Sequence, residues 1–170
     1  MLHLKTARGE RLEILATAIL AVMKPTDGVN PASIVYDMGA GPQFDQLANA
    51  YGFVKKSLLD SHAMVNPIEV RILEPVQIGD GDEAATALRE GRMFFPRAAI
   101  IGRREVTGDP GGIRARLYIN LLGKASAIHV ADTLDELDGE EPAPLSASAP
   151  AIVPPVPLPD ANHALTPKGE

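Results

Sequence analysis

Apolar residues recur along the chain in short blocks, and the spacing within each block predicts a strand or a helix. Residues 2–6 alternate between apolar and polar positions, which predicts a short strand. Residues 8–23 instead place Leu12, Leu15 and Ile19 on one face at helical intervals. This second block therefore predicts an amphipathic helix that follows the first strand closely.

The rest of the first 138 residues continues this alternation. Strands are expected at residues 32–37, 68–73, 98–101 and 127–131, where β-branched or aliphatic residues run together. Helices are expected at residues 44–51, 54–64 and 82–91, while residues 114–122 fit either a strand or a helix. Asp132 or Thr133 is expected to cap a last helical turn that reaches Leu137.

The order of these elements predicts the fold class. Strands and helices alternate at intervals of about 30 residues, which is typical of right-handed βαβ units. The sequence therefore predicts an α/β domain over residues 1–138, with a mostly parallel sheet and flanking helices in a Rossmann-like three-layer arrangement.

The composition changes from residue 139 onward. Eight of the fifteen prolines lie in residues 139–170, among alanine, serine and glutamate. Such a segment buries too little apolar surface to offset the entropy of ordering it. We therefore expect a disordered, acidic, Pro/Ala-rich tail, which serves either as a solubilising segment or as a docking site for a partner.

Charge and composition exclude several classes of protein. The chain has no cysteine, which rules out disulfides and thiolate metal sites, and its four histidines lack ligand spacing. The net charge of −6 argues against attraction of the whole protein to nucleic acid. The longest apolar run, residues 14–23, has about half of the roughly 20 residues that span a bilayer. A cytoplasmic protein without a membrane segment is expected.

One motif points to chemistry. Residues 34–36 are an apolar strand that leads directly into Asp37, and Gly39 and Gly41 follow. A carboxylate fixed at the carboxyl end of a parallel strand can hold Mg²⁺ through a water molecule, and glycine lets the backbone approach phosphate. The alternative is that Asp37 caps its own segment while the two glycines form a tight turn.

This motif resembles a known family. Residues 33–43, SIVYDMGAGPQ, look like the Walker B region of the ParA and MinD group of P-loop ATPases, especially plasmid-stability and partition members. The resemblance covers about residues 2–106. It implies that Asp37 binds Mg²⁺ through water and that Gly39 and Gly41 line an ATP site.

The family's other motif is missing. No G-x-x-x-x-G-K-[ST] loop occurs; its nearest approach is residues 123–126, GKAS, where Tyr118 stands in place of the first glycine. The resemblance therefore implies a degenerate or N-terminally incomplete relative without autonomous ATPase activity, which acts through a partner. ATP and Mg²⁺ are expected only if the missing loop is supplied elsewhere.

Two other functions fit the sequence. Residues 44–62 partly match a helix-turn-helix, in which Lys55, Lys56 and Ser57 would begin the recognition helix of a small DNA-binding regulator. The third hypothesis is an assembly protein whose folded domain packs in an oligomer while its proline-rich tail docks elsewhere. A protein partner or self-association is expected under all three hypotheses, and nucleic acid only for the DNA-binding regulator.

Overall fold

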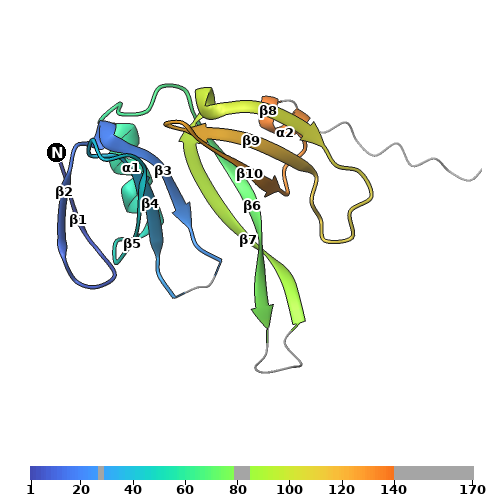
Figure 1. The fold of residues 1–170 in the computed structure, drawn as a ribbon, viewed down its shortest axis with the longest axis horizontal. Coiled ribbons are helices and arrows are strands. Elements are labelled where there is room, and N and C mark those ends of the chain that lie inside the picture. The colour runs from blue at the N-terminus through green and yellow to red at the C-terminus, as the bar shows by residue number, and fades with distance from the viewer. Residues whose placement is uncertain (27–28, 79–84, 140–170) are drawn as a thin grey trace, which may run out of the picture.

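The computed structural model describes residues 1–26, 29–78 and 85–139, and in this part of the chain the fold is built mainly from antiparallel strands (Figure 1). The strands are β1 (Leu2–Lys5), β2 (Arg11–Ile14), β3 (Ile19–Lys24), β4 (Ala32–Tyr36), β5 (Gln43–Leu47), β6 (Pro67–Ile78), β7 (Ala85–Pro96), β8 (Ile100–Glu105), β9 (Ala115–Leu121) and β10 (Lys124–Val130). The helices are α1 (Tyr51–Asp60) and α2 (Leu134–Asp138), with short 3-10 turns η1 (Ala16–Ala18) and η3 (Arg97–Ala99).

The expected α/β fold with a parallel sheet is wrong. Every strand pair in the described residues is antiparallel, including β3 with β4 and β4 with β5. A parallel pair needs a crossover connection of about a dozen residues or more. Residues 37–42, which join β4 to β5, are too few for that and form a hairpin turn instead.

Three expected helices are strands, whereas most expected strands are confirmed. Residues 8–23 contain β2, η1 and β3, and this strand–turn–strand sequence spaces its apolar residues much as a helix would. Residues 44–51 lie mostly in β5, and the described part of residues 82–91 belongs to β7. The strands expected at residues 2–6, 32–37, 68–73 and 127–131 are present.

The same structural unit occurs twice in the chain. Residues 2–60 form a hairpin, a 3-10 turn, three strands and a helix, and residues 67–138 form the same elements in the same order. We call these units the first repeat and the second repeat. Of the two caps that the sequence allowed, Asp132 and Thr133, it is Thr133 that caps the helix of the second repeat, through a capping box with Glu136.

Strand register shows that the two repeats match residue by residue. In β4–β5, Ala32 faces Leu47, and in β9–β10, Ala115 faces Val130. Both members of the second pair lie 83 residues after their counterparts in the first. All four of these residues are fully buried, so corresponding positions also serve corresponding cores.

A side chain that precedes each helix makes the same hydrogen bond in both repeats. The backbone N–H of Lys5 donates to Oδ1 of Asn49 over 2.7 Å. At the equivalent positions the N–H of Arg71 donates to Oδ2 of Asp132 over 2.6 Å, and the Arg71 Nε donates to Oδ1 over 2.6 Å. This hydrogen bond fastens the first strand of each hairpin to the segment that leads into the helix.

The repeats join edge to edge. Each has its strands in one order, β2-β1-β5-β4-β3 and β7-β6-β10-β9-β8, where a bridge between Thr6 and Leu47 connects β1 to β5. Strand β3 of the first repeat pairs with β7 of the second through Val22–Phe94, Met23–Met93 and Lys24–Arg92. We call this pairing the internal junction.

Strand β7 therefore belongs to two hydrophobic cores. Phe94 is 3% exposed and packs in the core of the first repeat, with Val22, Ile34 and Leu58. Its neighbour Phe95 points to the opposite face of the strand and packs in the core of the second repeat. Close approach at the internal junction also requires Gly91, where an added Cβ would lie 2.8 Å from the Lys24 carbonyl oxygen.

Neither α1 nor α2 has the length and apolar character needed to cross a membrane, and the described residues contain no other α-helix.

Candidate functional site

The carboxylate of Asp37 is bound within its own hairpin turn. Its Oδ1 accepts hydrogen bonds from the backbone N–H of Gly39 over 2.6 Å and of Gly41 over 3.0 Å. Both glycines have positive φ, +99° and +92°, which the turn requires. The Walker B resemblance is overturned, because β4 lies between two antiparallel neighbours rather than in a parallel sheet. Residues 123–126 likewise form the start of a hairpin strand and not a phosphate-binding loop.

The three residues expected to contact DNA lie on α1 and have local or structural partners. Lys55 forms an ion pair with Glu69 and lies 5.4 Å from the centre of the Phe94 ring, so it braces the internal junction. Burial, and the charge of Arg92, lower the pKa of Lys55. Lys56 forms an ion pair with Asp60. Ser57 donates a hydrogen bond from its hydroxyl to a backbone carbonyl oxygen of the same helix.

No helix-turn-helix surrounds these residues, because residues 43–47 form β5 instead of a first helix. Their proposed contact with DNA stays a prediction. The described residues also bring together no group of three or more His, Asp or Glu side chains that could hold a metal ion.

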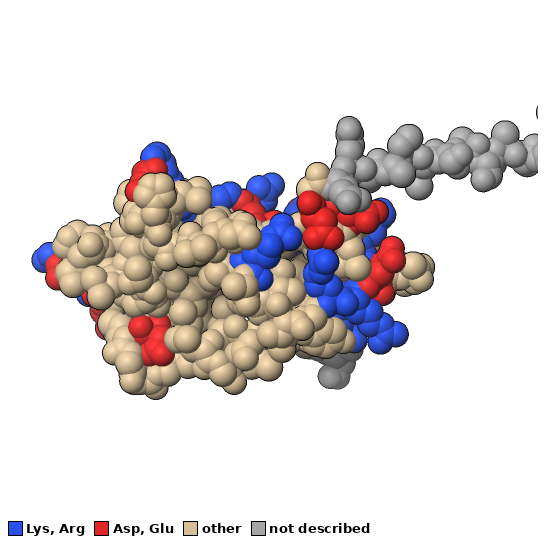
Figure 2. Space-filling model, turned by 90° about the horizontal axis from the view of Figure 1, so that it is seen from above, with Lys and Arg blue, Asp and Glu red and all other residues tan. Residues whose placement is uncertain are grey.

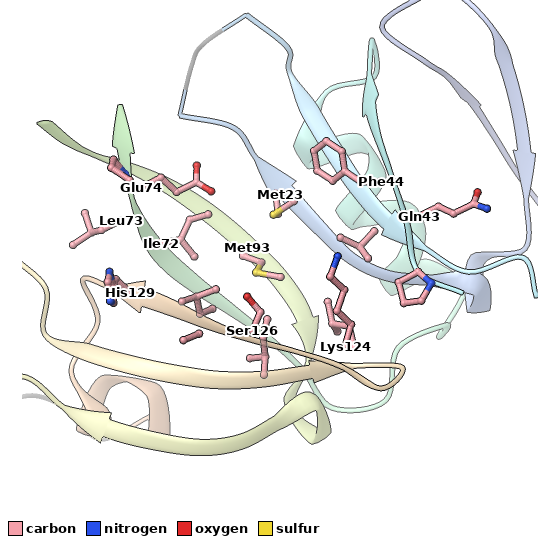
Figure 3. Close-up of a pocket in the computed structure, with 17 residues that line it drawn as sticks. Met23, Gln43, Phe44, Ile72, Leu73, Glu74, Met93, Lys124, Ser126 and His129 are labelled. Atoms are coloured by element: carbon pink, nitrogen blue, oxygen red, sulfur yellow. The ribbon is translucent and has the colours of Figure 1, made fainter. Parts of the chain in front are cut away.

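A cleft with a volume of about 670 Å³ lies between the two repeats (Figure 3). Its floor follows the internal junction, where Met23 of β3 faces Met93 of β7. Strand alternation explains this placement, because Val22 and Phe94 point into the first core and their neighbours must point the other way. We call this hollow the inter-repeat cleft.

Apolar side chains from both repeats form the walls of the inter-repeat cleft. On the first repeat, Val35 and Phe44 face each other across β4 and β5. On the second, Ile72, Ile119 and Ile128 come from β6, β9 and β10. Phe44 is 55% exposed and adjoins the other apolar side chains that line the cleft, so its ring extends a shared apolar surface.

Polar groups stand around this apolar surface. Glu74 accepts a hydrogen bond from the Thr26 hydroxyl over 3.1 Å, while Ser126 and His129 belong to β10. Lys124 also lines the cleft, and its ammonium group points across the opening in Figure 3. Among the described residues, the ion pairs do not include Lys124.

The inter-repeat cleft continues beyond its main volume. A second hollow of about 230 Å³ shares Met23, Phe44, Ile72 and Glu74 with it and extends along β3 to Thr26. The two hollows therefore form one continuous surface, whose lining includes both Lys124 and Thr26. A surface that joins two hollows in this way has room for an extended occupant.

Sequence reasoning missed these cleft residues. It placed Phe44 on a helix and considered Lys124 only as part of an imperfect phosphate-binding motif. The available signal was an internal similarity: residues 14–20, ILATAIL, and residues 95–101, FPRAAII, occupy equivalent places in the two repeats. Detecting it would have predicted a junction between repeats, and junctions of this kind are frequent places for binding sites.

The site as a whole offers apolar walls, the ammonium group of Lys124 and hydrogen-bonding groups at its rim. This combination can bind an apolar body that carries an anionic group. No known protein family, no curated protein and no solved structure matches this chain.

Proposed function

We propose that this protein is a binding module that takes an apolar segment of a partner protein, bearing an acidic group, in its inter-repeat cleft. The carrying observation is the cleft itself, whose volume of about 670 Å³ lies within the usual range for ligand sites of about 300–1,000 Å³. This develops the assembly-protein hypothesis. The proline-rich segment that formed part of that hypothesis lies outside the described residues.

The apolar walls support an apolar occupant. Phe44 is the best candidate for an anchor, because it is aromatic, half-exposed and shared by the main cleft and its extension. Aromatic side chains of this kind supply much of the energy at protein interfaces. Covering Phe44 would remove from water the apolar surface that the free protein leaves exposed.

The continuity of the two hollows supports a peptide segment, and Lys124 supports an acidic group on it. An extended peptide reaches about 3.3 Å per residue, so a few residues would follow the surface from Lys124 towards Thr26. A carboxylate next to Lys124 would form a charge-assisted hydrogen bond in a partly apolar setting.

The probe for this site is 1-anilinonaphthalene-8-sulfonate, a dye with an apolar body and one anionic group. A fluorescence titration of the full chain should show saturable binding. Phe44→Ala and Lys124→Glu should each weaken it by about tenfold, since each removes an anchor of roughly 1.4 kcal/mol or more.

A matched control for the aromatic change is available. Phe53 is 54% exposed, almost the same as Phe44, but it lies on α1 outside the cleft. Phe53→Ala should leave the affinity unchanged, and Lys56→Glu should do so for the charge. Equal loss in Phe44→Ala and Phe53→Ala, or no saturable binding by the unchanged protein, would refute the proposed site.

A further inference from the structure

The internal junction uses one edge of each repeat, and in the described part of the chain the other edge of each repeat has no strand partner. Strand β8 ends the eight-stranded sheet, and β2 pairs only with β1 among the described residues. By the match between repeats, β8 is the counterpart of β3, and β2 is the counterpart of β7. The chain thus carries both halves of a second junction, at opposite ends of the molecule (Figure 1).

The register of this second junction follows from the first. Ile19 and Ile100 start β3 and β8, and the register irregularity after each of them falls at the same place. Equivalent residues in this part of the repeats therefore lie 81 positions apart. If β8 met β2 of another copy as β3 meets β7, the facing pairs would be Arg103–Glu13, Arg104–Leu12 and Glu105–Arg11.

Two of these three pairs join opposite charges. Cross-strand pairs of opposite charge stabilise an antiparallel pairing, and like charges directly opposite each other destabilise it. The internal junction, which defines this register, has two apolar pairs, Val22–Phe94 and Met23–Met93, and one pair of like charge, Lys24–Arg92, so it has no pair of opposite charge. The charge match at the open edges is therefore an independent observation.

A further pair lies beside the strands. At the internal junction Lys55 of α1 forms an ion pair with Glu69 of β6. The equivalent positions at the open edges are Asp138 of α2 and His3 of β1. An imidazole N–H can donate to a carboxylate, so this pair is also complementary, although the polarity is reversed relative to the internal one.

The open edges are exposed in the single chain. Ile101 on β8 is 62% exposed, whereas Leu20, its counterpart on β3, is partly buried. Figure 2 shows Lys and Arg side chains next to Asp and Glu at both ends of the long axis, where the β1–β2 hairpin and β8 lie in Figure 1. Arg103 donates to Asp138 over 2.5 Å, which holds the guanidinium group at this edge.

We propose that the protein associates head to tail with further copies of itself, with β8 of one copy paired antiparallel to β2 of the next. The partner is a second copy of this chain, and complementary charges fix the register. A heterologous contact of this kind builds a ring if its rotation closes and a filament if it does not. The proposal is independent of the inter-repeat cleft, whose residues it does not use.

Sedimentation velocity of the full chain over a range of protein and salt concentrations tests the proposal. The unchanged protein should associate as its concentration rises, and added salt should weaken the association because both edge pairs are exposed. Arg103→Glu and Glu13→Arg should each raise the concentration needed for association by at least about tenfold, because each places like charges opposite each other.

Mixing the two variants gives the decisive result. Where β8 of the Arg103→Glu variant meets β2 of the Glu13→Arg variant, the two charges are exchanged and attract each other again. The reverse contact keeps the original Arg103–Glu13 pair, so an equimolar mixture should associate. Glu105→Arg mixed with Arg11→Glu gives the same test without touching the contact to Asp138, while it removes the ion pair between Arg11 and Glu13 instead. Lys56→Glu mixed with Asp60→Lys, on the exposed face of α1, is the matched control and should leave association unchanged.

Three results would overturn the proposal. The first is an unchanged protein that stays monomeric at all concentrations, which would mean that the charges protect the edges against pairing. The second is association that persists in all single variants. The third is a mixture that fails to associate although each variant keeps the thermal unfolding midpoint of the unchanged protein.

Discussion

Phe94 and Phe95 are adjacent on β7, yet they should stabilise different halves of the molecule. Phe94 is 3% exposed and belongs to the core of the first repeat, while Phe95 is 0% exposed and belongs to the core of the second. Truncating a buried phenylalanine to alanine costs about 3–5 kcal/mol. We expect Phe94→Ala and Phe95→Ala to lower the free energy of unfolding by similar amounts but at different places.

Hydrogen exchange followed by mass spectrometry distinguishes these places. In Phe94→Ala, faster exchange should concentrate in peptides from residues 2–60, although the substituted residue lies in the second repeat. In Phe95→Ala, it should concentrate in residues 67–138. At the lower bound of about 3 kcal/mol, local opening would become more frequent by over a hundredfold.

Each variant is the control for the other, since the two changes remove the same side chain from neighbouring positions of one strand. Exchange that rises equally in both halves in both variants would show that the chain opens as one unit. In that case the assignment of two separate cores to β7 would be wrong.

Two further predictions concern single side chains. Asp132→Ala removes the acceptor for the backbone N–H and the guanidinium of Arg71, so chemical denaturation should show a loss of about 2–3 kcal/mol. Asp132→Asn, which copies Asn49 of the first repeat, keeps one acceptor oxygen and should lose only about half as much stability as Asp132→Ala. Burial raises the pKa of Tyr36 and of Tyr51 from 10.0 to about 12. Their contribution to stability is therefore fully present below about pH 10 and is lost as the pH rises through about 12. Tyrosinate absorbance should show two late ionisations, and ionisation of both near pH 10 would contradict this burial.

The strands were largely readable from the sequence, but their directions were not. Residues 32–37 predicted β4 correctly, because β-branched and aromatic residues favour strands wherever they pair. The apolar content of a strand says little about the direction of its neighbours. Connection length does, and the short turn at residues 37–42, with two glycines and a proline, favoured a hairpin.

The inter-repeat cleft was out of reach of local patterns. Met23 and Met93 lie 70 positions apart, and only the register of β3 against β7 brings them together in the floor of the inter-repeat cleft. Phe44 needed β5 to be recognised as a strand before its face could be assigned. The helical spacing in residues 8–23 was misleading too. A 3-10 turn lies between the two strands of this segment, and it separates their apolar residues by intervals like those of a helix.

The short connection formed by residues 61–66 has a consequence for the surface chemistry of the strands. By tethering the repeats, it gives β3 and β7 a local concentration on the order of millimolar, so their meeting does not depend on diffusion. A strand edge that is permanently paired within its own chain can be apolar without promoting aggregation with other molecules. The matching edge of β8 has no strand neighbour among the described residues, and the arginines and glutamate that it carries make any pairing at this edge sensitive to charge and to salt.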